Sequence, residues 1–477
     1  MNAARSSPRR HPRPRASAFL LALGALLLAT GCGEREAPAV PVARNLLLVT
    51  LDTTRADHLS CYGYERPTSP HLDALAAVGH RFSDAQTVMP TTLPSHAAMF
   101  TSLRPRELGV RTNESIVSPA AHTLAERLSE RGFAAGAFVS ATPLHPRFGL
   151  AQGFATYDHP ADAERPGDET RVRAVEWLRA HATERFFCFV HLFDAHTWYM
   201  SPDPWREQFG APRRVLPPAR EFVPDRAAFT PEVRRASIDA YDAEIRFADE
   251  QLGALLAELD ALGLRETTLV VVLADHGETL DELLEPYGYA FDHGEFLHRR
   301  ELRVPLVVAP PAGALAAGPQ VHDELVSTLD LMPTVLDLLG VPCEEPCSGR
   351  SLVPLFSGGA LPPRPVVAER RQLAPAEIQR PPSPFLKGVE LSATTPSWHF
   401  VRCEGRPLEL YDVAADPEEL VNLSAVQPDA VARMQELIDA WQAARAVALP
   451  SGAGREVDPK LLEELRALGY ATGDQGE

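Results

Sequence analysis

A set of acidic and imidazole side chains in this sequence has the chemistry of a divalent-metal site. Aspartate oxygens and histidine nitrogens that converge on one edge of a sheet are ligands that such metals take. A helix cap or a satisfied surface polar group explains any single member, whereas the whole set predicts metal binding. Its members are Asp52, Asp194, His196, Asp275, His276 and His293.

Thr92 carries a hydroxyl that is suited to nucleophilic attack. It stands two residues before Pro94 and opens a helix-forming run that continues to Thr101. Proline is favoured in the first turn of a helix, and the free N–H groups and partial positive charge of that end suit a phosphate or sulfate. A hydroxyl placed there can attack an anionic ester once its proton is removed. The simpler alternative is that Thr91 or Thr92 only caps the helix.

Short apolar runs that alternate with helical patterns must position these side chains. Such runs suit strands buried on both faces, and the alternation predicts a doubly wound α/β core. In an open α/β sheet, ligands bind at the carboxyl ends of the strands, where Asp52, Asp194 and Asp275 stand. The expected strands are Asn45 to Leu51, Ala134 to Val139, Phe186 to Leu192, Thr267 to Ala274 and Val304 to Ala309, and the most evident helix is Pro231 to Leu262.

Length and composition fit one large domain followed by a smaller one. The chain has 477 residues, of which 45% are hydrophobic, and its net charge of −18 argues against electrostatic binding to nucleic acid. Past Gly340, frequent proline and glycine precede short strand candidates and a further helix. We expect a signal peptide over 1–31, a tether over 32–43, a catalytic core over 44–340, a C-terminal subdomain over 341–449, and a short helix with a polar tail over 450–477.

The N-terminus has the pattern of a bacterial lipoprotein signal. A basic segment precedes a short apolar run from Phe19 to Ala29, and Leu28 to Cys32 resembles a lipobox. This pattern predicts an exported lipoprotein that is anchored to the membrane through Cys32, in the periplasm or at the cell surface. The alternative is a plain secretory signal. Because an exported protein can hold disulfides, Cys343 and Cys347 are candidates for a pair.

The segment from Leu51 to Leu59 resembles the opening motif of the sulfatase-like branch of the alkaline phosphatase superfamily. Thr92 to His96 matches the sulfatase nucleophile motif C/S-x-P-S-R in position, and Ala274 to Glu278 resembles the second metal motif. The resemblance extends from Asn45 to Trp441. It implies an α/β fold with an alkaline-phosphatase-like central mixed, mostly parallel sheet flanked by helices, and a smaller C-terminal α+β subdomain. It also implies hydrolysis of sulfate or phosphate esters.

The sequence departs from the sulfatase pattern at positions that matter for sulfate chemistry. Sulfatases carry at the position of Thr92 a cysteine or serine that is oxidised to formylglycine, an aldehyde that threonine cannot form. His96 replaces the family arginine, and Thr53 replaces the second aspartate of the opening pair. The lysine that sulfatases hold near the region of His293 is missing. These departures favour phosphate esters or diesters somewhat over sulfate esters.

A second branch of the superfamily matches several of these positions. Nucleotide pyrophosphatase/phosphodiesterase-like members use a threonine nucleophile with two zinc ions, and their ligands follow the chain order seen here. They also hold a phosphate oxygen with an asparagine that follows the nucleophile at a spacing like that of Asn113. Two spacings differ from that branch. Asp194 and His196 are closer together in the sequence, and His293 follows Asp275 and His276 sooner.

We expect one metal at Asp52, Asp275 and His276. This metal would bind Thr92 Oγ and lower the pKa of the hydroxyl, so that Thr92 attacks phosphorus or sulfur and forms a covalent ester. Aspartate and histidine ligands favour zinc or manganese, although calcium or magnesium would also be tolerated.

Further residues are expected to stabilise charge and to hydrolyse the covalent ester. Arg55 and Asn113 would stabilise the anionic charge. A second metal held by Asp194, His196 and His293 would supply the hydroxide. If it is absent, His196 or His293 would act as acid and base.

Three functions agree with this sequence. The first is hydrolysis of a small-molecule or glycan ester by a metal-dependent, sulfatase-like enzyme. The second is transfer of a phospho group from Thr92 to an envelope glycan or lipid. The third is an inactive lipoprotein that binds a glycan or another anion, against which the complete set of acid and imidazole groups argues. The oligomeric state is left open.

Overall fold

The computed structural model of this chain describes residues 42–213, 226–315, 318–345, 347–370, 388–444, 449, 458–468 and 470. The predicted signal peptide, Cys32 and almost all of the predicted tether lie outside the described residues. The lipid anchor and the export of the protein therefore stay predictions. Within the described ranges, no helix is long and apolar enough to cross a membrane.

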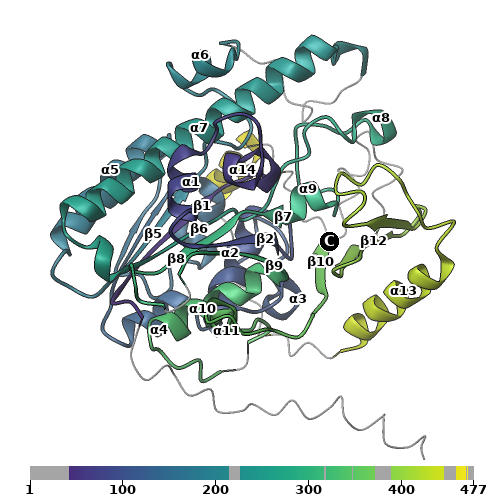
Figure 1. The fold of residues 1–477 in the computed structure, drawn as a ribbon. Coiled ribbons are helices and arrows are strands. Elements are labelled where there is room, and N and C mark those ends of the chain that lie inside the picture. The colour runs from purple at the N-terminus through teal and green to yellow at the C-terminus, as the bar shows by residue number, and fades with distance from the viewer. Residues whose placement is uncertain are drawn as a thin grey trace, which may run out of the picture.

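A mixed, mostly parallel sheet forms the centre of the molecule (Figure 1), and nine strands of the described chain contribute to it. The strand order is β4-β3-β5-β1-β6-β8-β2-β7, and β9 pairs with β2. The block from β4 to β6 is parallel, whereas β8 is antiparallel to β6. The strands are β1 Asn45–Leu51, β2 His80–Gln86, β3 Ala134–Val139, β4 Thr156–Asp158, β5 Phe186–Leu192, β6 Thr268–Leu273, β7 Arg303–Val304, β8 Leu306–Ala309 and β9 Gln320–Ser327.

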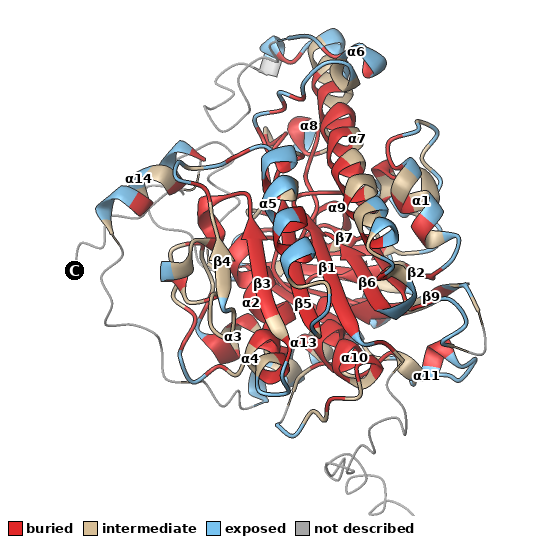
Figure 2. Cartoon of the chain, turned by 90° about the vertical axis from the view of Figure 1, so that its left-hand side faces the viewer, coloured by how far each residue is buried: buried red, intermediate tan, exposed pale blue. Residues whose placement is uncertain are grey.

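The central strands are buried on both faces because they are apolar along their whole length. Alternate side chains of a strand point to opposite faces. Leu46 and Leu48 of β1 therefore belong to the core on one face of the sheet, and Leu47 and Val49 belong to the core on the other. Figure 2 shows this arrangement, with buried central strands beneath helices whose outer sides are exposed.

Helices cover the two faces of the sheet. The core that contains Leu46 includes residues of α2, α4, α10 and α11, and the core that contains Leu47 includes residues of α1, α5 and α7. Thr230 caps α7 as its spacing before Pro231 suggests, since its Oγ1 accepts a hydrogen bond from Val233 N at 3.4 Å. The helices are α1 Pro70–Ala76, α2 Thr92–Thr101, α3 Pro105–Leu108, α4 Leu124–Ser129, α5 Gly167–Ala180, α6 Trp205–Phe209, α7 Pro231–Ala261, α8 Leu284–Tyr287, α9 Arg299–Leu302, α10 Leu331–Leu338, α11 Val353–Phe356, α13 Pro428–Ala443 and α14 Pro459–Ala467.

A small antiparallel sheet follows the core and packs on α13. Its strands are β10 Val366–Arg370, β11 Glu390–Thr394, β12 Trp398–Cys403 and β13 Glu409–Asp412, in that spatial order. Leu391 and Phe400 of this sheet share a core with Met434 and Ile438 of α13. The predicted fold class, a mixed and mostly parallel sheet flanked by helices with a smaller C-terminal unit, is confirmed. The residue limits predicted for the units stay predictions.

The Sγ atoms of Cys343 and Cys347 lie 3.8 Å apart without a disulfide between them. These two thiols flank a short loop after α10, and Cys347 Sγ also lies 3.5 Å from Gly349 O. Cys188 is buried within β5, as its apolar surroundings in the sequence suggest. The fold therefore brings the candidate cysteine pair close together.

Candidate active site

Thr92 and three potential metal ligands meet at the carboxyl end of the central sheet. Asp52 directly follows β1, and Asp275 and His276 come just after β6, which pairs with β1 in parallel. The ligand atoms of these three residues all lie within 4.8 Å of one another. Thr92 is the first residue of α2, and its Oγ1 lies 3.5 Å from His276 Nε2. The structure thus brings the four side chains together as the sequence predicts.

The carboxyl group of Asp275 needs a positive partner. Oδ1 accepts hydrogen bonds from the backbone N–H groups of Thr53 at 3.3 Å and His276 at 2.9 Å. Oδ2 is buried and has no hydrogen-bond partner among the described residues. Burial, and next the negative charge of Asp52, raise the pKa of Asp275 well above its usual range. A divalent cation between the two carboxylates would remove this cost, so the donor set fits a metal.

His276 has the tautomer that a metal ligand requires. Its Nδ1 lies 3.0 Å from Gly277 O, and a carbonyl oxygen can only accept, so Nδ1 carries the proton. The lone pair of Nε2 is therefore left on the side of Thr92. A backbone carbonyl that fixes the ring in this way is a common support of metal-bound histidine.

His191 orients Asp52 and is a site residue that the sequence analysis missed. It lies on β5, and its Nε2 donates to Asp52 Oδ2 at 2.9 Å, while Ser140 N donates to Nδ1 at 3.4 Å. Burial, and next the charge of His276, lower the pKa of His191 to about 3, so the imidazole is neutral. A histidine near the end of the apolar run from Phe186 to Leu192 was the available signal.

His96, at the position of the family arginine, is a buried support of α2. Its Nδ1 donates to Thr92 O at 2.8 Å, and its Nε2 lies 3.0 Å from Thr50 Oγ1. Burial, and next the charge of His191, lower the pKa of His96 well below its usual range. His96 is therefore a neutral imidazole that ties α2 to β1, and it brings no positive charge to the nucleophile.

Asn113 is held at the start of α2 with one amide hydrogen-bond donor available. Its Oδ1 accepts a hydrogen bond from Leu93 N at 2.8 Å, which satisfies one N–H of the first helical turn. Its Nδ2 is buried and has no partner among the described residues. Thr91, the N-cap residue, makes no capping hydrogen bond with its side chain. The arrangement leaves the Asn113 amide as a hydrogen-bond donor at the start of α2, and such a donor can bind an anion.

A second group of potential metal ligands adjoins the first. The ligand atoms of Glu278, Asp292 and His293 lie within 4.8 Å of one another, and all three residues are buried. The rings of His276 and His293 are 4.4 Å apart between centroids, so the two groups are neighbours. His293 belongs to the second metal site predicted from sequence, whereas Glu278 and Asp292 escaped that prediction. Their places next to His276 in Asp-His-Gly-Glu and next to His293 in Phe-Asp-His-Gly were the available signals.

The three residues predicted for the second metal separate in the structure. His196 and His293 are neighbours, with ring centroids 5.0 Å apart. Asp194 instead accepts a hydrogen bond at Oδ1 from Gly167 N, at the first residue of α5, at 2.8 Å. Among the described residues, neither group of potential ligands includes Asp194. Burial of its carboxyl group raises the pKa of Asp194 to about 7.

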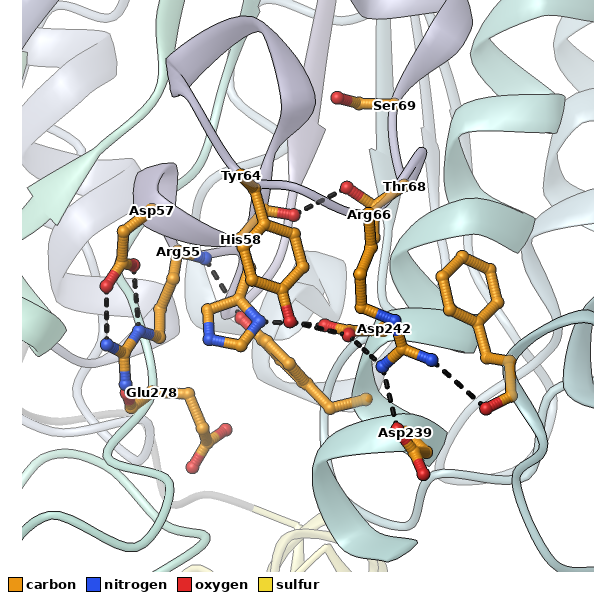
Figure 3. Close-up of polar contacts among 12 residues, drawn as sticks. Arg55, Asp57, His58, Tyr64, Arg66, Thr68, Ser69, Asp239, Asp242 and Glu278 are labelled. Atoms are coloured by element: carbon orange, nitrogen blue, oxygen red, sulfur yellow. Dashed lines mark hydrogen bonds and ion pairs between the residues drawn. The ribbon is translucent and has the colours of Figure 1, made fainter. Parts of the chain in front are cut away.

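Arg55 pairs with carboxylates rather than standing as a charge ready for a substrate anion (Figure 3). Its guanidinium contacts Asp57 Oδ2 at 2.6 Å and Glu282 Oε1 at 2.5 Å, and it also donates to Glu278 O at 3.2 Å. The predicted role of Arg55 in stabilising the transferred anion therefore needs correction, because two carboxylates already compensate its charge. Its observed role is to join the opening motif to the loop that carries Glu278.

The rest of the opening motif fixes the turn after Asp52 to α7. Figure 3 shows Tyr64 and Arg66 converging on Asp242, with Tyr64 Oη donating to Asp242 Oδ2 at 2.7 Å. Tyr241, also on α7, donates to Thr53 O at 2.8 Å. Thr53 has φ of +51°, a strained conformation for a β-branched residue that surrounding contacts must hold. The motif thus positions the chain directly after Asp52, a potential metal ligand.

The sulfatase family model matches residues 44–341 of this chain. The chain belongs to the sulfatase family. Family membership identifies it as a hydrolase acting on sulfate or phosphate esters. The resemblance drawn from its motifs is thereby confirmed, whereas the role of threonine at the formylglycine position stays a prediction.

Individual relatives include sulfatases, and a solved phosphonate monoester hydrolase shares the fold. The chain is 33% identical over 198 residues to the choline-sulfatase of Rhizobium meliloti, a match that spans 41% of this chain and 34% of that protein. It is 24% identical over 424 residues to the Delta 4,5-hexuronate-2-O-sulfatase of Bacteroides thetaiotaomicron, covering 80% of this chain and 84% of the relative. The phosphonate monoester hydrolase of Agrobacterium radiobacter has the same fold, with a TM-score of 0.67 at 21% identity over 84% of this chain and 95% of that one.

Proposed function

We propose that this protein is a metal-dependent hydrolase that uses Thr92 as its nucleophile and favours phosphate esters or diesters over sulfate esters. One observation carries the proposal. Thr92 Oγ1 lies at the first turn of α2, beside the buried group of Asp52, Asp275 and His276. A hydroxyl in that place has a metal-ligand set on one side and the positive end of a helix at its base.

Asp52, Asp275 and His276 would hold the metal, because their ligand atoms cluster and Asp275 Oδ2 has no hydrogen-bond partner in the described chain. Glu278, Asp292 and His293 offer a second ligand set beside the first. Mixed carboxylate and imidazole donors favour zinc or manganese. When bound, such an ion supplies positive charge that lowers the pKa of the hydroxyl and stabilises anionic oxygens.

The side chains of the site would then divide the reaction between them. Thr92 would lose its hydroxyl proton to solvent once its pKa is lowered, and Oγ1 would then form a bond to phosphorus or sulfur while the bond from that atom to the leaving oxygen breaks. Asn113 Nδ2 donates to a non-bridging oxygen of the transferred group. His196 Nδ1 donates to Thr197 O at 2.7 Å, which leaves Nε2 to exchange protons. In its imidazolium form His196 would give the Nε2 proton to the leaving oxygen, and the neutral ring would later accept a proton at Nε2 from the water that hydrolyses the covalent ester.

Threonine favours phosphate chemistry because it stays an alcohol. A formylglycine hydrate can expel sulfate by elimination, whereas an ester on Thr92 must be attacked by water. The neighbouring imidazoles of His196 and His293 provide the acid–base groups for that step. Family relatives that act on hexuronate sulfate esters extend the candidate substrates to glycan esters as well as small molecules. The lipobox at Cys32 supports anchoring to a bacterial membrane outside the cytoplasm.

A substrate panel on protein of defined metal content tests the proposal. We expect hydrolysis of an aryl phosphate, phosphodiester or phosphonate to exceed hydrolysis of the matching aryl sulfate. Thr92→Ala should lower kcat/KM for every ester by about 10²–10⁴-fold while metal binding persists. Thr91→Ala is the matched control, since it removes the neighbouring hydroxyl, which makes no capping bond. Full activity of Thr92→Ala would refute the proposal.

A further inference from the structure

The last described helix of the chain packs onto the catalytic core. Leu461 and Leu465 of α14 are buried in the same core cluster as α2, and Leu468 packs with Phe193. Glu464 Oε2 accepts a hydrogen bond from Thr142 Oγ1 at 3.0 Å. Figure 2 shows α14 at the periphery, with exposed residues on its outer side. A short helix from the C-terminal end of the chain is thereby brought next to the site.

Tyr470 extends from this helix to the nucleophile. Its backbone N–H donates to Leu465 O at 2.9 Å, which turns the chain after α14. Its Oη lies 3.2 Å from Thr92 Oγ1 and 2.9 Å from His196 Nε2. Its ring lies beside those of His196 and His293, with centroids 5.8 Å and 6.2 Å away. The phenol oxygen therefore bridges the proposed nucleophile and the proposed acid–base residue.

A bound ester would need the space that Tyr470 Oη fills. At the start of nucleophilic attack the reacting atoms are about 3–3.5 Å apart. The oxygens around phosphorus or sulfur then lie near Thr92 Oγ1 at about the distance of Tyr470 Oη. Thr92 itself is 0% exposed, so no solvent molecule reaches it in this arrangement. Tyr470 and an ester thus exclude each other.

We propose that α14 and Tyr470 form an intramolecular cap, in which the phenol oxygen stands in for an ester oxygen, and that substrate binds by displacing it. The cap rests on the proposed function in taking Thr92 as the nucleophile. Its attachment is confined to a nine-residue helix and Tyr470: it rests on the buried Leu461, Leu465 and Leu468, on the hydrogen bond between Glu464 and Thr142, and on the contacts of Tyr470 Oη with Thr92 and His196. When only a minor fraction of the protein is open, the apparent Kd for a ligand equals the Kd of the open form divided by that fraction. The cap therefore weakens the apparent affinity for substrate.

Affinity for inorganic phosphate tests the cap directly. The full-length, metal-loaded protein is titrated calorimetrically with inorganic phosphate, and KM for an aryl phosphate is measured beside it. We expect Tyr470→Ala to tighten phosphate binding and to lower KM by about 5–30-fold, the value of two modest hydrogen bonds and some ring packing. Tyr470→Phe should give a smaller change in the same direction. Glu463→Ala, on the exposed side of α14, is the matched control and should resemble the wild type.

Two outcomes would overturn the cap. A fall in kcat for Tyr470→Phe with unchanged phosphate affinity would mean that the phenol acts in the reaction instead. Unchanged phosphate affinity and kinetics in both tyrosine variants would mean that Tyr470 does not cover Thr92 in solution. Thr92→Ala run in parallel separates the two proposals. If that variant stays active, the proposed nucleophile is wrong, while the phosphate affinity of Tyr470→Ala still reports on the cap.

Discussion

Replacing Asp275 with asparagine should abolish the stabilisation of the folded protein by metal. Burial and the charge of Asp52 already raise the pKa of the Asp275 carboxyl group, so the metal-free protein holds an unfavourable pair. Asparagine keeps the shape of the side chain but removes the charge and one ligand oxygen. At a metal concentration 100 times the Kd, binding stabilises the wild type by about 2.7 kcal/mol. For a core of this size that corresponds to a rise in Tm of about 3–5 °C.

Thermal unfolding in chelator and in excess Zn²⁺ or Mn²⁺ measures this difference. Asp275→Asn should show almost no rise in Tm with metal, and its metal-free Tm should equal or exceed that of the metal-free wild type. Asp194→Asn is the matched control, because Asp194 has a buried carboxyl oxygen outside both ligand groups of the described chain. A response of wild-type size in Asp275→Asn would refute the assignment. Loss of the response in Asp194→Asn would restore Asp194 as a ligand.

Three further predictions follow from single contacts. His191→Phe should weaken metal binding about 10–100-fold in a competition titration, because Asp52 loses the N–H that orients it; unchanged affinity would contradict this. Asn113→Asp keeps the acceptor for Leu93 N but loses the Nδ2 donor, so kcat/KM should fall about 10²–10³-fold with little change in Tm; wild-type kcat/KM would remove Asn113 from the site. Burial, and next the charge of His322, lower the pKa of His80 to about 4. The folded state therefore binds fewer protons than the unfolded state, and the free energy of unfolding falls as pH drops below about 6.5. Urea unfolding at pH 7 and at pH 5 measures how much free energy of unfolding is lost between them. His80→Gln should lose about 2 kcal/mol less of it than the wild type, and equal losses would show that His80 does not titrate in this way.

The parts of the site that follow from sequence are those tied to strand ends and to one helix start. Asp52 and Asp275 end apolar runs, and parallel pairing of β1 with β6 brings two such ends together. Thr92 was identifiable because proline two residues on marks a first helical turn. The alternating burial of β1 likewise followed from its unbroken apolar run. In each case a local sequence pattern indicates where a strand ends or a helix begins, and the strand order of the sheet brings these positions together.

The parts that escaped prediction depend on which way a side chain turns after its strand ends. Asp194 follows β5 as expected, but its carboxylate accepts a hydrogen bond from the N–H of Gly167, the first residue of α5, and does not join the potential metal ligands. Arg55 stands in a recognisable motif, yet Asp57 and Glu282 engage its charge. Tyr470 reaches Thr92 across 378 residues of sequence, a contact that no local pattern encodes. Loop paths decide these contacts, and loop paths depend on tertiary packing.

Detection of a covalent ester on Thr92 is the most direct test of the proposed mechanism. Metal-loaded wild type is mixed with excess aryl phosphate, quenched in acid within the first turnovers, and digested with trypsin for mass spectrometry. The relevant peptide runs from Phe82 to Arg106, because Arg104 precedes proline. We expect a phosphoryl group on Thr92 that disappears in a chase and never forms in Thr92→Ala. A phosphoryl group on another residue of an active enzyme, or steady turnover by Thr92→Ala, would contradict the account.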